Sequence, residues 1–389
     1  MKSWVMFMLL GRIMVEVAVV LGRHCQHHCG AGSLTLENAS LHLGNGHAFI
    51  ANSLDFKGFR CQPVWVRWNC STFLGANTIS MMPNITLGVR FVCDSSLVKA
   101  RHDKNHTTPL REYISIFLNT VEFYLRKSEC PEVKLVLTGV NETTKEEESH
   151  FEKTHNEFRL TLDPTFTLGL FQKWVQENIN FKNDDIVFLL TSILIEDHIG
   201  DGISPNGYSY FNEICSLGVG LVRDSGVMFD GVLSVAQQIA HMLGSPWDIS
   251  DTCPESDETL MAPRYFSSPQ GLSECTKEAL RQQYNNNTIN DVCWKKTLKP
   301  DVSSNWSLPV TYFKTENYCS TRHSHRVFEC PEGNRYHVAN ATECFMGCCV
   351  NNTKEASGFK YSVPDGTPCG ENKICIYARC SEFSKENSD

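Results

Sequence analysis

The fold is decided by an apolar stretch in the middle of the chain, DIVFLLTSILI at residues 185–195. Its length and content fit a strand buried on both faces, and it is too short to span a membrane. Strand patterns precede it at residues 85–93 and 134–140. Apolar side chains at helical spacing fill residues 111–127 and 168–179. This β-α-β-α-β order predicts an α/β domain in which helices flank a mixed, twisted sheet.

Two further elements are expected after this stretch. Residues 214–222 predict a short strand interrupted by glycine, which fits the edge of the sheet. A helix should follow from residue 231 or 232 to residue 243. Gly244 is placed to end this helix in a left-handed conformation, and Pro246 prevents its continuation.

Length and charge narrow the class of protein. A chain of 389 residues holds roughly two or three domains at typical domain sizes. Hydrophobic residues make up 41% and charged residues 20%, which excludes a wholly disordered chain. Lys and Arg number 35 against 44 Asp and Glu, a net charge of −9, so the chain offers no general attraction to phosphate backbones. Nucleic acid is not expected as a partner.

The cysteine content and the first residues predict a secreted protein. Eighteen cysteines are too many for a reduced compartment and fit a disulfide-bonded extracellular protein with few or no free thiols. Residues 1–22 combine Lys2 with two apolar stretches that Arg12 and Glu16 interrupt. We interpret them as a signal peptide, with a signal anchor as the alternative. After cleavage no membrane attachment is expected.

N-glycosylation sequons also support the prediction of a secreted protein. Nine Asn residues begin N-x-S/T, and their spread predicts surface loops throughout the chain. They are Asn38, Asn69, Asn84, Asn105, Asn141, Asn286, Asn305, Asn340 and Asn351.

Cysteine density divides the chain unevenly. Eight of the cysteines fall between residues 319 and 380, which indicates a small disulfide-stapled module with little core of its own. The Pro- and Ser-containing stretch before it reads as a linker. The expected organisation is a signal peptide (1–22), an N-terminal segment (23–84), the α/β domain (85–295), a linker (296–318), the Cys-rich module (319–380) and a tail (381–389).

A motif at the predicted helix end carries a resemblance to a known family. Residues 237–248 read QQIAHMLGSPWD and resemble the zinc-binding signature H-E-x-x-H-x-x-G-x-x-H-D of the metzincin metalloproteases. In that signature three His side chains bind zinc, and the Glu is the general base for the zinc-bound water. The positions correspond as follows: Gln237, His241 and Trp247 stand at the three ligands, Gln238 at the base, and Gly244 and Asp248 match.

Other segments follow in the family's order. ETLMAPRYFSS at residues 258–268 resembles the Met-turn beneath the metal, with Met261 as its methionine. ICS around Cys215 and the stretch 273–294 are similar to the reprolysin branch, and 364–380 looks like the Cys-rich ends of adamalysin-type proteases, closest to the secreted reprolysins of tick saliva. The resemblance implies a zincin-like α+β fold over roughly residues 85–380. It also implies that residues 23–84 are a shortened or remnant prosegment.

The substitutions in the motif remove the chemistry that the resemblance implies. His241 is the one imidazole left, Trp247 has no lone pair, and a neutral amide such as Gln237 is a poor zinc ligand. Gln238 cannot accept and return a proton as a carboxylate does. No cofactor is therefore expected here, although active relatives hold zinc.

Four other segments have chemistry of their own. HCQHHC at residues 24–29 has metal-ligand composition, but a disulfide or an unstructured start is favoured. RHSHR at 322–326 reads as a solvated basic loop, or as a contact for an acidic partner, and KEEES at 145–149 as an exposed charged loop. Cys61 or Cys70 could imitate an inhibitory thiolate.

The sequence therefore predicts a secreted, inactive reprolysin-type pseudoprotease that binds an extracellular protein partner. Binding would use the edge strand at residues 214–222 or the Cys-rich module, because an edge strand pairs with an extended peptide without a metal. One alternative is an active zinc metalloendopeptidase with non-standard ligands. Another is a structural glycoprotein without a specific partner.

Overall fold

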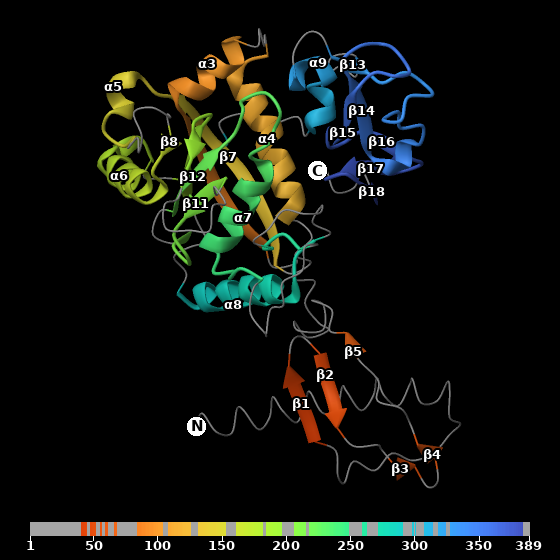
Figure 1. Cartoon of the computed structure of the whole chain (residues 1–389). Helices are drawn as coiled ribbons and strands as arrows, with labels where there is room; N and C mark the ends of the chain where they lie inside the picture. Colours follow the sequence, from red (N-terminus) through yellow and green to blue (C-terminus); the bar gives the residue numbers. More distant parts are fainter. Residues whose placement is uncertain are drawn as a thin grey trace. The chain divides into compact units, whose positions relative to one another are not determined.

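The computed structural model divides the chain into two compact units, Met1–Thr78 and Ile79–Asp389 (Figure 1). In the first unit the structure describes short strands only. In the second it describes most of the chain, namely residues 84–103, 108–125, 131–152, 161–181, 184–196, 206–214, 218–248, 259–262, 271–290, 298, 300, 307–313, 318–323 and 327–383. The predicted signal peptide, the HCQHHC stretch, Cys61 and Cys70 lie outside the described residues.

The first unit is described as two small antiparallel sheets. One has the order β1-β2-β5, and the other pairs β3 with β4. The strands are β1 (Ser40–Gly44), β2 (His47–Ala51), β3 (Asp55–Phe56), β4 (Phe59–Arg60) and β5 (Val66–Arg67).

A five-stranded sheet of order β11-β12-β9-β6-β7 forms the centre of the second unit. Its neighbouring strands are parallel except for β11, which runs antiparallel to β12. This confirms the predicted mixed α/β fold. The strands are β6 (Asn84–Cys93), β7 (Glu132–Glu142), β9 (Ile186–Thr191), β11 (Gly207–Ser209) and β12 (Gly218–Arg223).

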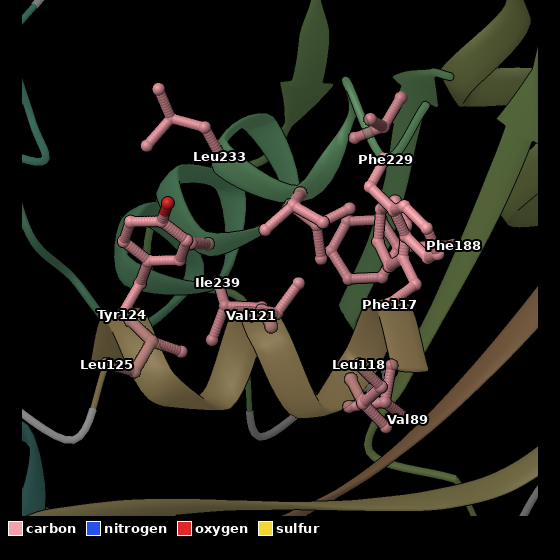
Figure 2. Packing of buried hydrophobic residues seen from close by; sticks show 14 of the residues in the cluster. Val89, Phe117, Leu118, Val121, Tyr124, Leu125, Phe188, Phe229, Leu233 and Ile239 are labelled. Atoms are coloured by element: carbon pink, nitrogen blue, oxygen red, sulfur yellow. The ribbon is translucent and has the colours of Figure 1, made fainter. Parts of the chain in front are cut away.

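Helices cover both faces of this sheet, as the strand sequences require. Every residue of β9 is buried, and its alternate side chains enter two different cores. Helices α4 (Leu110–Leu125) and α7 (Val232–Met242) pack on one face, where Figure 2 shows Val121 and Ile239 meeting between them. Helix α6 (Pro164–Glu177) packs on the other. The remaining elements of this domain are α3 (Ser95–Asp103), α5 (Lys145–Glu148), β8 (Thr161–Leu162), η2 (Ile179–Phe181), β10 (Leu194–Ile195) and α8 (Glu274–Asn290).

The predicted edge strand at residues 214–222 is wrong in its position. Strand β12 is an inner strand, paired with β9 on one side and β11 on the other, so the edge is β11. Gly218 and Gly220 of β12 are explained by close packing instead. A Cβ on Gly220 would lie 2.2 Å from Phe188, and one on Gly218 would lie 2.8 Å from the sulfur of Met242. They allow α7 to pack close to the sheet rather than marking its edge.

The long apolar stretch at residues 185–195 is also not one strand. It divides into β9 and the two-residue β10, which pairs with β8 in a separate ladder. The backbone turns at Ser192, whose N–H and hydroxyl group both donate to Ser96 Oγ at 3.0 Å. A buried polar contact across the chain therefore ends the strand, which the apolar pattern alone does not reveal.

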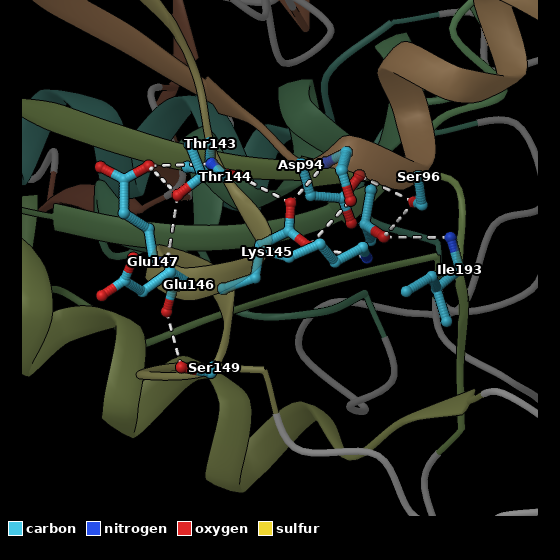
Figure 3. Close-up of polar contacts among 12 residues, drawn as sticks. Asp94, Ser96, Thr143, Thr144, Lys145, Glu146, Glu147, Ser149 and Ile193 are labelled. Atoms are coloured by element: carbon cyan, nitrogen blue, oxygen red, sulfur yellow. Dashed lines mark hydrogen bonds and ion pairs between the residues drawn. The ribbon is translucent and has the colours of Figure 1, made fainter.

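The KEEES stretch is a capped helical turn rather than an exposed charged loop. Thr144 and Glu147 form a capping box at its start. Glu148 is 2% exposed and accepts hydrogen bonds from the backbone and hydroxyl of Ser95, at 2.6 and 2.8 Å, and from Thr143 Oγ1 at 3.1 Å. Figure 3 shows this network joining α5 to the end of β6. The prediction failed because one carboxylate of the charged run turns inward.

Four disulfides staple the Cys-rich module, as expected from its cysteine density. They are Cys319–Cys348, Cys330–Cys349, Cys344–Cys375 and Cys369–Cys380. Two three-stranded antiparallel sheets carry them, in the orders β13-β14-β15 and β16-β17-β18. The elements are η4 (Pro309–Thr311), α9 (Tyr318–Arg322), β13 (Phe328–Glu329), η6 (Ala341–Glu343), β14 (Phe345–Cys349), β15 (Gly358–Ser362), β16 (Pro368–Gly370), β17 (Lys373–Ile376) and β18 (Arg379–Glu382).

The Cys-rich module shares the core of the α/β domain. Tyr124 of α4 donates a hydrogen bond to Asp365 Oδ2 at 3.0 Å, and burial raises the pKa of Asp365 to about 6. Part of the predicted linker is packed rather than free, because Leu308 and Phe313 belong to the main hydrophobic core. The module is thereby fixed to α4.

The structure corrects the expectation that all sequons lie in loops, and it adds one finding on a cysteine and one on membrane helices. Three sequons lie in regular elements rather than loops: Asn84 in β6, Asn141 in β7 and Asn286 in α8. Cys93, at the end of β6, is buried and unpaired. Within the described residues, no helix combines the length and the apolar content that crossing a membrane requires.

Candidate functional site

Helix α7 carries the metzincin-like motif, and a buried carboxylate fixes its start. Asp224 accepts hydrogen bonds from the backbone N–H groups of Gly226 and Gly231, at 2.6 and 2.8 Å, and from Tyr113 Oη at 2.7 Å. Burial, followed by the charge of Asp230, raises the pKa of Asp224 to about 6. These contacts tie the helix start to the end of β12 and to α4.

The helix ends as the sequence predicts. Gly244 has φ +84°, its N–H donates to the carbonyl of His241, and the N–H of Ser245 donates to that of Ala240. This is a Schellman motif, which requires a left-handed residue at the position of Gly244. It turns the chain so that Trp247 returns toward the helix.

Both glutamines of the motif are buried and held by hydrogen bonds. Gln237 is 1% exposed, and its Nε2 donates to the backbone carbonyl of Leu260 at 2.7 Å. Gln238 is 3% exposed, and its Oε1 accepts from Ser209 Oγ of β11 at 2.7 Å. The side chains that replace a metal ligand and a general base thus join α7 to the Met-turn and to the edge strand.

His241 lies between two aromatic rings. Its ring centroid is 5.6 Å from that of Trp247 and 5.2 Å from that of Phe211. Its Nδ1 is 3.3 Å from the carbonyl oxygen of Ser245, so this nitrogen carries the proton. Burial lowers the pKa of His241, and the Ser245 contact opposes that shift only partly.

Met261, which the resemblance assigns to a Met-turn, packs beneath the end of the motif. Met261 is fully buried, and its carbonyl accepts from the N–H of Asp248 at 3.0 Å. The carboxylate of Asp248 accepts from Thr259 Oγ1 at 2.6 Å and from Ser273 Oγ at 2.8 Å. Asp248 therefore has a structural role, joining the end of the motif to residues 259–261 and to the start of α8.

The structure brings the predicted positions together, and it adds two residues that sequence reasoning missed. Ser209 and Phe211 reach α7 because β11 pairs antiparallel with β12, and the N–H of Asn212 donates to the carbonyl of His241. The alternating pattern of GYSYF at residues 207–211 is the signal that could have found this strand.

The residues present do not fit a catalytic zinc ion. His241 is one imidazole donor, Trp247 offers a ring without a lone pair, and the amide of Gln237 already donates to the Met-turn. Among the described residues, one other group has metal-ligand spacing, Cys344 with Cys369 and Cys375, but all three cysteines are in disulfides. No catalytic step through a metal follows from this site.

Comparisons with known proteins identify the family. Residues 102–294 match the model described as "Reprolysin (M12B) family zinc metalloprotease". Venom metalloproteinase 2 of Eulophus pennicornis is 27% identical over 187 residues, which are 46% of this chain and 43% of that protein. The protein "A disintegrin and metalloproteinase with thrombospondin motifs 12" of Mus musculus is 26% identical over 239 residues, 57% of this chain and 14% of that protein. The central domain is a reprolysin domain.

The chain spans less than half the length of either relative. The crystal structure of metalloproteinase-II from Bacteroides fragilis aligns with 69% of the chain and 70% of its own, at 13% identity and a TM-score of 0.32. A score this low adds nothing to the fold described above. The assignment of residues 102–294 to the reprolysin family therefore rests on the sequence comparisons. The altered motif at residues 237–248 is read from the sequence of this chain itself.

Proposed function

We propose that the protein is a secreted reprolysin-like pseudoprotease that binds an extracellular protein through the open edge of its sheet. The observation that carries this proposal is the packing of Trp247 against His241, together with the hydrogen bonds that occupy Gln237 and Gln238. Groups that would bind metal and activate water are instead part of the packed structure.

The edge strand supports binding without catalysis. The N–H of Arg223 donates to the carbonyl of Asn206, so the alternation of an antiparallel ladder directs the backbone groups of Gly207 and Ser209 away from β12. In the described part of the chain no strand pairs with that side of β11. Free N–H and C=O groups on an edge strand can pair with an extended peptide.

Two measurements test the proposal. The purified full chain is expected to leave a denatured protein substrate uncut, with or without added zinc, while binding a fluorescent extended peptide such as Ac-Thr-Val-Thr-Val-Thr-Val-Thr-amide. Ser209→Pro removes an N–H from the open edge without removing a ladder hydrogen bond, and it should weaken peptide binding about tenfold relative to Ser209→Ala, which loses the same hydroxyl bond to Gln238 but keeps the N–H.

Cleavage that a zinc chelator stops would favour the active metalloendopeptidase instead. Equal peptide binding by Ser209→Pro and the unaltered chain would show that the edge is not the binding surface. Phe359→Ala is the matched control, since Phe359 is 60% exposed on the Cys-rich module and far from β11 in sequence.

A further inference from the structure

Phe211, His241 and Trp247 form a group that we call the three-ring site. Phe211 is 52% exposed, and His241 and Trp247 are half-buried, so solvent reaches all three rings. The site lies next to the open edge, because Ser209 on β11 is bonded to Gln238, one turn before His241 on α7.

One nitrogen of His241 is directed by the structure to accept a hydrogen bond. The carbonyl oxygen of Ser245 can only accept, so Nδ1 donates its proton in this hydrogen bond and Nε2 is the acceptor of the neutral ring. The imidazole also lies against the rings of Phe211 and Trp247, both in tilted geometry. The site therefore presents an acceptor flanked by electron-rich rings.

The sequence that supplies this site is rich in acidic residues and poor in Lys and Arg. From residue 196 to residue 262 the chain has eleven Asp and Glu residues and one basic side chain other than histidine, Arg223. No Lys or Arg occurs in residues 206–214 or 237–248, which supply the site and its surroundings. Glu213 is exposed two residues after Phe211 and raises the pKa of Tyr210 by its charge, after the effect of burial.

We propose that the three-ring site binds the side chain of a lysine or arginine within an extended, basic segment of the partner protein. This inference rests on the proposed function, since the segment is the one that pairs with β11. An ammonium or guanidinium group is attracted to aromatic faces, and it donates a hydrogen bond that Nε2 of His241 accepts.

The strand geometry brings such a side chain to the site. Alternate side chains of a strand point to the same face of the sheet. Ser209 points to the face covered by α7, and a peptide added beside β11 continues the sheet with its own alternate side chains on that face. One residue of the peptide therefore lies over α7, where His241 and its two rings are.

The experiment compares four peptides, Ac-Thr-Val-Thr-X-Thr-Val-Thr-amide, in which X is arginine, lysine, norleucine or glutamate. Fluorescence anisotropy with the full chain measures each dissociation constant. The arginine and lysine peptides are expected to bind about tenfold more tightly than the norleucine peptide, and the glutamate peptide most weakly. Raising the salt concentration should reduce only the advantage of the basic peptides.

Variants separate the rings from the acceptor. Phe211→Ala, at an exposed position, should lower the affinity of the arginine peptide toward that of the norleucine peptide, and Phe359→Ala should leave both unchanged. His241→Phe keeps an aromatic ring but removes Nε2. It should therefore reduce the preference for arginine and lysine, while the affinity for the norleucine peptide stays the same. Trp247→Phe should retain most of the preference.

The outcomes distinguish this inference from the proposed function. Equal binding of the norleucine and arginine peptides, weakened alike by Ser209→Pro, would overturn the cation site and leave edge binding in place. Binding of none of the four peptides would overturn both. A preference for arginine that survives both Phe211→Ala and His241→Phe would also overturn the three-ring site, because it would place the cation elsewhere.

Discussion

The indole ring of Trp247 lies against the imidazole of His241, with ring centroids 5.6 Å apart and ring planes inclined by 31°. In the family signature these two positions are metal ligands, and both imidazoles would point at one ion. Here a side chain without a lone pair occupies the place of the third ligand. The contact is thus a packing interaction where relatives are expected to have a coordination shell.

The first prediction concerns the metal content of the purified protein. One imidazole and two occupied amides cannot hold zinc against dialysis, so we expect far less than one zinc per chain. Elemental analysis after dialysis without chelator measures this. A value near one zinc per chain would contradict the pseudoprotease, and addition of excess zinc followed by a second dialysis controls for metal lost during purification.

The second prediction concerns free thiols. Cys93 is buried and unpaired, and burial raises the pKa of its thiol, so a maleimide should not label it in the folded protein. Labelling in denaturant without reductant should modify it. Eighteen cysteines are an even number, so a monomer with one free thiol must have a second, and mass spectrometry should find an even count.

Cys93→Ala should remove one labelled site and leave the others. Complete absence of labelling at Cys93 in the denatured chain would show that this cysteine is paired in solution. The original expectation of few or no free thiols treated all eighteen cysteines as equal. One free thiol agrees with that expectation, but the sequence could not show that it is Cys93, which is buried at the end of an inner strand.

The sequence predicted the main elements because each has a strong period of its own. The helix at residues 111–127 became α4, and the strand at residues 85–93 became β6, within about two residues at each end. Edge strand β11 was missed because it is only three residues long, so the alternation in GYSYF at residues 207–211 is a weak signal. Its neighbour β12 was mistaken for the edge because glycines that serve helix packing look like strand breakers.

For a similar reason, the sequence predicted the part of the site on α7 but missed the part that β11 contributes. The spacing of QQIAHMLGSPWD places Gln237, His241 and Trp247 near one another by helix geometry and one turn. Phe211 lies 30 positions before His241 in the chain, so only the pairing of β11 with β12 brings it there. Local spacing predicts contacts within a helix and its cap, and it cannot predict contacts that a sheet creates.

The third prediction concerns a carboxyl pair at the end of β6. Burial, followed by the charge of Asp94, raises the pKa of Glu152 to about 8 from an ordinary value of 4.5. Asp94 Oδ2 and Glu152 Oε1 are both buried, and neither atom has a hydrogen-bond partner among the described residues. We therefore expect the two carboxyl groups to share one proton in the folded state.

The sign of the pH effect follows from this proton. Between about pH 4.5 and pH 8 the folded chain holds a proton on Glu152 that the unfolded chain has released, so the free energy of unfolding falls as the pH rises. Glu152→Gln keeps a donor for Asp94 at every pH. We expect it to raise the free energy of unfolding at pH 8 by about 1 kcal/mol, a value reduced for the partial exposure of Glu152, and the Tm by about 3 °C.

Thermal unfolding at pH 5 and pH 8 measures this difference. At pH 5 the two chains should be nearly equal, because the shared proton is already present in the unaltered protein. Glu146→Gln is the matched control, since Glu146 is exposed on α5, six residues before Glu152, and should change neither curve. Equal pH dependence in Glu152→Gln and the unaltered chain would mean that the pair does not share a proton.

The last prediction is that the lost metal site can be rebuilt. Gln237→His, Gln238→Glu and Trp247→His together restore three imidazoles and a carboxylate on a helix whose cap at Gly244 and supporting Met261 are in place. Replacing the indole removes the ring that lies against His241, and the hydroxyl of Ser209 can donate to a glutamate as it does to Gln238.

The triple variant is expected to bind close to one zinc per chain, whereas Gln238→Glu alone should bind none, because it adds a base but no imidazole ligand. Loss of the packed indole should lower the free energy of unfolding by about 2–3 kcal/mol, which zinc should restore in part. Elemental analysis and thermal unfolding with and without zinc measure both effects. A triple variant that is secreted and resists proteolysis, yet takes up no zinc, would show that QQIAHMLGSPWD does not occupy the position of the metzincin signature.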